Sequence, residues 1–80
     1  MCRVKAKVLE GMIDEEKFVY IKDASGEICE VIVPTTAVSG ETCAVWEVAR
    51  DGDRVLVELP RESSTGAWRV WVDSSQVIAA

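Results

Sequence analysis

The stretch Val33-Pro34-Thr35-Thr36-Ala37-Val38 recurs in outline 39 positions later, as Val72-Asp73-Ser74-Ser75-Gln76-Val77. Each copy closes an apolar, alternating run with two small hydroxyl residues and a returning valine. Self-similarity at a fixed spacing indicates two copies of one supersecondary unit. We therefore treat residues 1–80 as a single domain built from approximate half-repeats, 1–40 and 41–80.

Almost every apolar segment of the chain alternates with period two, which is typical of half-buried strands. Polar segments that contain Gly or Pro separate these runs, as turns do. The expected strands are residues 3–9, 17–22, 27–33, 42–50, 53–59 and 67–73. We predict an all-β fold, either a small six-stranded barrel or two packed β-meanders with an approximate internal two-fold repeat.

The dipeptide Asp51-Gly52 between two alternating runs favours a two-residue type I′ hairpin. This turn sets the register of its strands by placing Arg50 opposite Asp53. Six apolar residues then share one side of the hairpin, and the facing pairs are Val48 with Val55, Trp46 with Val57, and Ala44 with Leu59. The register therefore predicts that Trp46 lies in the core.

The hairpin within residues 17–33 has two possible registers. A four-residue loop puts Phe18 and Tyr20 on the face of Cys29 and Val31. A three-residue loop with a bulge puts Val19 and Ile21 on that face instead. Both registers remain open at this point.

Both faces of this hairpin are apolar in either register, which is more than a small open sheet can shield. One exposed Ile or Phe forgoes roughly 1.5–3 kcal/mol, and a small domain has about 5–15 kcal/mol in all. We therefore expect sheet closure, a homo-oligomer or a protein partner to cover the spare face. The predicted interface residues are Val19, Ile21, Ile28 and Ile32.

Composition places the chain among small folded proteins. It has 80 residues, of which 49% are hydrophobic, and three cysteines without the spacing of a disulfide framework. No apolar run approaches the ~20 residues of a membrane helix, and none marks a signal peptide. We expect a cytoplasmic protein without membrane association. The net charge of −5 counts against nucleic acid as its main partner.

Residues 66–77, Gly-Ala-Trp-Arg-Val-Trp-Val-Asp-Ser-Ser-Gln-Val, resemble the end of an SH3-like barrel. In that family a strand runs into a one-turn 3₁₀ helix and returns as a short last strand. The resemblance covers the last third of the chain. It implies architecture and no ligand, because the Ala-Leu-Tyr-Asp-Tyr stretch of peptide-binding members has no counterpart in the sequence.

Candidate catalytic groups are few. The chain has no histidine, which removes the usual general base and the commonest metal ligand. We therefore expect no enzyme activity and no cofactor. Cys29 and Cys43 fit a core, whereas Cys2 lies near the terminus and could be exposed. A symmetric oligomer could bring copies of Cys2 together as a metal site or a disulfide, so a small metal or redox protein is an alternative.

Arg3, Lys5 and Lys7 form a basic stripe on one side of the first strand. As a binding site, this stripe would contact nucleic acid, with aromatic side chains stacking on the bases. The simpler interpretation is an edge strand protected by charge, or a partner for Glu47 and Glu58 on a neighbouring strand.

Trp71 points away from the apolar face of its strand, between Arg69 and Asp73. An outward Trp beside an Arg is typical of a protein contact site. The alternative is that Trp71 covers one end of a closed barrel. The first hypothesis is therefore a non-enzymatic, self-associating interaction module with Arg69 and Trp71 beside its partner site.

Overall fold

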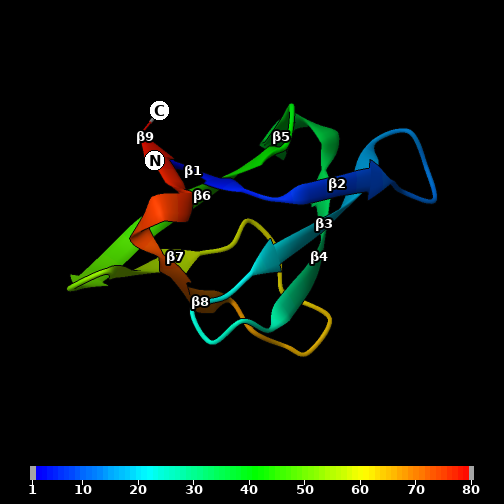
Figure 1. The fold of residues 1–80 in the computed structure, drawn as a ribbon. Helices are drawn as coiled ribbons and strands as arrows, with labels where there is room; N and C mark the ends of the chain where they lie inside the picture. Colours follow the sequence, from blue (N-terminus) through cyan, green and yellow to red (C-terminus); the bar gives the residue numbers. More distant parts are fainter. Residues whose placement is uncertain (1, 80) are drawn as a thin grey trace.

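The computed structural model describes residues 2–79, and the regular elements in that range are strands and 3₁₀ turns (Figure 1). The first half contains β1 (Cys2–Lys5), β2 (Lys7–Glu10), β3 (Glu16–Lys22), β4 (Ile28–Pro34), η1 (Thr35–Ala37) and β5 (Val38–Ser39). The second half contains β6 (Thr42–Asp51), β7 (Arg54–Glu58), β8 (Arg69–Asp73), η2 (Ser74–Gln76) and β9 (Val77–Ala79). The predicted all-β class is confirmed. No helix within residues 2–79 has the length and apolar character needed to cross a membrane.

The described strands form two antiparallel sheets. One has the order β8-β7-β6-β1-β9, with β5 added beside β6, and the other has the order β2-β3-β4. The chain passes from one sheet to the other at Ala6, whose N–H donates to the carbonyl of Glu41 at 2.9 Å. Because β1 and β2 pair in different sheets, the two sheets do not close into a barrel. The predicted barrel is therefore wrong, and the arrangement is one of two packed sheets.

The internal repeat is visible in the strand register. Val38 pairs with Cys43 where β5 meets β6, and Val77 pairs with Val4 where β9 meets β1. These two pairs are equivalent under a shift of 39 residues, and so are the turns η1 and η2. Val4 and Cys43, themselves 39 apart, are paired at the centre of the β1–β6 ladder. Each half therefore lends its last strand to the first strand of the other.

The loops of the two halves also make reciprocal contacts. The N–H of Ala24, between β3 and β4, donates to the Trp71 carbonyl in β8 at 2.8 Å. The N–H of Ser64, between β7 and β8, donates to the Glu30 carbonyl in β4 at 2.9 Å. Each long loop thus covers the free edge of a strand in the opposite half.

The first hairpin has the three-residue loop. The N–H of Asp23 donates to the Glu27 carbonyl at 2.8 Å, and Gly26 has a φ of 92°, as expected for a turn that ends in a left-handed residue. This register turns Val19 and Ile21 into the core, where both are fully buried. The predicted interface therefore does not form one surface, because its other two members, Ile28 and Ile32, lie on the opposite, exposed face.

The second hairpin differs from its predicted register. Asp51 pairs with Arg54, so the two loop residues are Gly52, with a φ of 59°, and Asp53. Glycine with positive φ at the first loop position belongs to a type II′ turn. The strand pairing is thus shifted by two residues from the prediction, and such a shift by itself leaves each side chain on its predicted face of the hairpin.

A bulge then exchanges the faces of β6. The register shifts between Glu47 and Ala49, so that Glu47 pairs with Val57 and Trp46 with Glu58. An extra residue in one strand reverses which side chains point inward beyond it. Trp46 is consequently 46% exposed, and the prediction that it lies in the core is wrong.

Valine dominates the core between the sheets. Its fully buried members are Val4, Val19, Ile21, Val31, Val33, Cys43, Val45, Val55, Val57, Leu59 and Val72. They come from both halves of the chain, so neither half has a separate core.

We expect Ile21→Ala to lower the free energy of unfolding by about 2–5 kcal/mol, because the buried side chain would leave a cavity. Ile28→Ala, on the exposed face of the same hairpin, is the matched control and should cost less than about 1 kcal/mol. Urea denaturation of both variants measures the difference. Equal losses would contradict the register found for this hairpin.

The Asp73 carboxylate begins η2 by accepting the N–H of Ser75 at 2.9 Å. Hydrogen bonds from the Ser75 backbone and hydroxyl lower the pKa of Asp73 below its ordinary 3.8. The charged form therefore stabilises the fold above that value, and this contribution disappears as pH falls through the lower folded-state pKa. Asp73→Asn keeps an acceptor but no charge, so its deficit relative to the wild type should shrink in acid. Unfolding midpoints that differ equally at neutral and acid pH would contradict this.

Candidate binding groove

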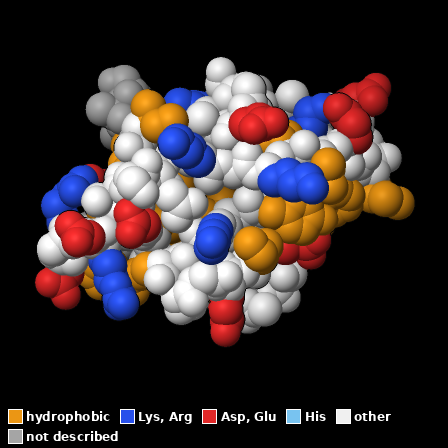
Figure 2. Space-filling view, in the orientation of Figure 1, with side chains coloured by type: hydrophobic (Ala, Val, Ile, Leu, Met, Phe, Trp, Pro, Cys, Tyr) orange, Lys and Arg blue, Asp and Glu red, His pale blue; other side chains and the backbone are white. Residues whose placement is uncertain are grey.

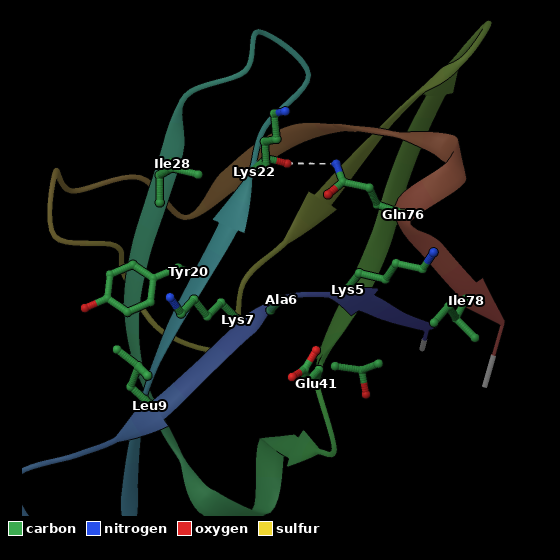
Figure 3. A pocket seen from close by; sticks show the side chains of 11 residues that line it. Lys5, Ala6, Lys7, Leu9, Tyr20, Lys22, Ile28, Glu41, Gln76 and Ile78 are labelled. Atoms are coloured by element: carbon green, nitrogen blue, oxygen red, sulfur yellow. Dashed lines mark hydrogen bonds between the residues drawn. The ribbon is translucent and has the colours of Figure 1, made fainter.

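An open groove of about 940 Å³ lies between the outer face of the β2-β3-β4 sheet and the region where β6 and β9 begin (Figure 3). Its lining comes from segments far apart in the sequence. The basic lining residues are Lys5, Lys7 and Lys22, and the aliphatic ones are Ala6, Leu9, Ile28 and Ile78. One acidic residue, Glu41, also lines the groove, which therefore combines an excess of positive charge with an apolar surface.

The three lysines stand on three different strands, with Lys5 in β1, Lys7 in β2 and Lys22 in β3. All three are exposed, and none forms a salt bridge with any residue in the described range 2–79. Figure 2 shows basic, acidic and apolar side chains interspersed on the side of the molecule drawn in Figure 1. In a chain of net charge −5, the three lysines are a local excess of unpaired positive charge.

The apolar part of the groove follows from the register of its sheet. Leu9 pairs with Phe18 and Lys7 pairs with Tyr20. On this face of the sheet, an apolar pair of side chains therefore lies next to a lysine–tyrosine pair. Ile28 and Ile78 are 61% and 40% exposed. These side chains give the groove an exposed apolar surface.

Tyr20 lies beside Lys7 at one side of the groove (Figure 3). A hydrogen bond with Glu30, the next residue across the sheet, raises the pKa of the Tyr20 phenol. The phenol therefore stays protonated at neutral pH. Its ring contributes surface to the groove, and its hydroxyl is not a free acid or base.

The structure divides the predicted basic stripe. Lys5 and Lys7 line the groove, whereas Arg3 is used within the fold. The Arg3 Nε donates to Thr42 Oγ1 at 2.7 Å, and its Nη2 donates to the carbonyls of Ala37 and Thr42 at 3.2 and 3.3 Å. Arg3 therefore ties β1 to η1 and β6.

The structural interpretations offered for this stripe are also corrected. β1 lies between β6 and β9, so it is not an edge strand. Glu47 pairs with Arg50 and Glu58 pairs with Arg69, both at 3.1 Å, rather than with the lysines. Sequence reasoning missed Lys22 and Ile78, since only the non-local pairing brings them to the groove.

Trp71 and Arg69 lie on a different surface, the outer face of β7 and β8. Trp71 points outward as predicted, opposite Leu56, and borders a hollow beside residues 23–25. The guanidinium of Arg69 is bound to Glu58. The two predicted contact residues are thus neighbours, away from the groove.

The cysteines belong to the core and its margin. Cys2 is buried although it lies near the terminus, and burial raises the pKa of its thiol. Burial also raises the pKa of Cys29, and that of Cys43 to about 11. Such thiols are rarely thiolates at neutral pH. Within residues 2–79, no three His, Cys, Asp or Glu residues are grouped so that they would hold a metal ion.

No protein-family model, curated protein or solved structure matches this chain. The ligand of the groove is therefore inferred from the shape and charge of the groove itself.

We expect Arg3→Ala to lower the free energy of unfolding by about 1.5–3 kcal/mol, because its charged hydrogen bonds to Thr42 and Ala37 would be lost. Lys5→Ala on the same strand should change it by about 0.5 kcal/mol or less. Thermal or urea unfolding of the two variants compares them. A larger loss from Lys5→Ala would show that this lysine has a structural role.

Proposed function

We propose that the protein is a non-enzymatic interaction module whose groove binds a protein segment carrying acidic and aliphatic side chains. The observation that carries the proposal is the set of three unpaired lysines around an apolar surface. Carboxylates of the segment would pair with Lys5, Lys7 and Lys22. Its aliphatic side chains would lie on Leu9, Ile28 and Ile78.

The combination of positive charge and apolar surface favours a peptide over a small polar anion as the ligand of the groove. A small anion would use the lysines and leave the exposed Leu9 and Ile28 uncovered. A protein segment that carries both carboxylates and aliphatic side chains can cover both. Charge complementarity would also raise its association rate.

Single-stranded nucleic acid is the competing ligand. Proteins of that class combine a basic surface with several aromatic side chains on which bases stack. The groove contains one aromatic ring, that of Tyr20, and the chain is acidic overall. The single ring favours the peptide, whereas the net negative charge of the chain opposes both acidic ligands alike.

The proposed setting is the cytosol. The thiols of Cys2, Cys29 and Cys43 are free and have raised pKa values, which suits a reducing compartment. The absence of histidine from the sequence supports a role in binding rather than catalysis.

A peptide of alternating Glu and Leu residues, titrated into ¹⁵N-labelled protein, should shift the backbone amide signals of Lys7, Leu9 and Lys22. Lys5→Glu/Lys7→Glu should weaken binding at least about 10-fold, equivalent to about 1.4 kcal/mol. Arg54→Glu/Arg61→Glu is the matched control, because it makes the same charge change at exposed positions outside the groove.

Two results would contradict the proposed function. One is that the peptide shifts signals on the outer face of β7 and β8 and leaves the groove unchanged. The other is that single-stranded RNA binds more tightly than the peptide with a steep salt dependence, which would favour the nucleic-acid alternative.

A further inference from the structure

The loop between β2 and β3 carries the kind of side chains that the groove would bind. Its sequence, Met12-Ile13-Asp14-Glu15, places two apolar residues before two carboxylates. Met12 is 86% exposed and Ile13 is 55% exposed. In Figure 1 this loop projects from the body of the molecule at the far end of β2.

The backbone of this loop is held in place although its side chains are exposed. Thr35, at the start of η1, donates its N–H to the Glu15 carbonyl at 2.8 Å and its hydroxyl to the Asp14 carbonyl at 2.9 Å. The Glu16 N–H donates to the Ile13 carbonyl at 3.2 Å. Gly11 packs so closely that a side chain there would clash with the Glu16 carbonyl. A loop already fixed in this way loses little conformational freedom on binding.

We propose that the protein self-associates by placing the Met12–Glu15 segment of one copy in the groove of a second copy. The inference rests on the proposed function, because it names the partner of that groove. Asp14 and Glu15 would meet the lysines, while Met12 and Ile13 would cover the exposed aliphatic side chains. Occupant and site then match in both charge and apolar character.

The contact must join two molecules because Asp14 and Glu15 do not reach the lysines of their own groove. The loop follows β2 directly and is anchored to η1 through Thr35. Leu9 brings one end of the groove near the loop. Lys5, Lys7 and Lys22 lie toward the other end of the β2–β3 ladder, where Lys7 pairs with Tyr20. The segment of one chain is therefore available only to another copy.

The net charge of −5 on each copy does not prevent this contact. Repulsion between whole molecules acts over distances that exceed the Debye length, which is about 8 Å at physiological ionic strength, so dissolved salt largely screens it. The lysine–carboxylate contacts act at shorter range. Reciprocal exchange of two loops about a two-fold axis would close the assembly as a dimer.

Charge reversal on each side of the contact tests the proposal, with mass measured by light scattering. The groove variant is Lys5→Glu/Lys7→Glu and the loop variant is Asp14→Lys/Glu15→Lys. Each variant alone places like charges together, so we expect the dissociation constant of its dimer to be at least about 10 times that of the wild-type dimer. An equimolar mixture should associate again, because every loop then meets a groove of opposite charge.

The loop variant also separates this contact from a general charge effect. Its two substitutions each add two positive charges, so its net charge is −1 instead of −5. Lower net repulsion alone would strengthen its association, whereas the proposal predicts that association is lost. Arg54→Glu/Arg61→Glu has the net charge of the groove variant and should keep the wild-type mass.

Two outcomes would overturn the inference. One is a wild-type protein that stays monomeric at about 100 μM, a concentration at which interfaces of micromolar affinity are formed. The other is a dimer that both variants retain. If the acidic peptide still binds the groove in either case, the proposed function stands and only the identity of the partner is wrong. If the peptide does not bind, both proposals fail.

Discussion

The pairing of β1 with β6 holds the two halves of the molecule together. Val4 and Cys43 face each other at its centre, and both are fully buried. β9 lies on the other side of β1, and β5 pairs with β6. Backbone hydrogen bonds and apolar burial thus coincide at one ladder, and the positions of both sheets follow from it.

The groove is a consequence of the way the chain leaves that ladder. At Ala6 the strand passes from one sheet to the other, so Lys5 and Lys7 stand on either side of the crossing point. A closed barrel would continue the pairing there and fill the gap. The open arrangement instead leaves lysines and aliphatic side chains around a shared hollow, which is the basis of the proposed binding function.

Local patterns were enough to predict most strands and the repeated turn, but not the division of residues 3–9 into β1 and β2 or the short strand β5. The hydroxyl pairs at residues 35–36 and 74–75 mark η1 and η2, and Gly26 fits one of the two hairpins considered. The resemblance to SH3-like barrels stays a prediction, although a 3₁₀ turn and a short final strand are present at residues 74–79. The faces of β6 were not predictable, because a bulge near Val48 has no clear signal in a period-two pattern. The groove required knowledge of non-local pairing, since Lys22 and Ile78 are distant from Lys5 in sequence.

The exchange of last strands allows the two halves to be joined in either order. Cys2 and Ala79 are paired positions of β1 and β9, so the two ends of the described chain lie side by side (Figure 1). Gly40, between the halves, is exposed and has a φ of 59°. A circular permutant opened at Gly40 and closed by a short linker between the old ends would keep every strand intact. The two halves can therefore be joined covalently in either order, whereas the pairing of their strands has to be kept.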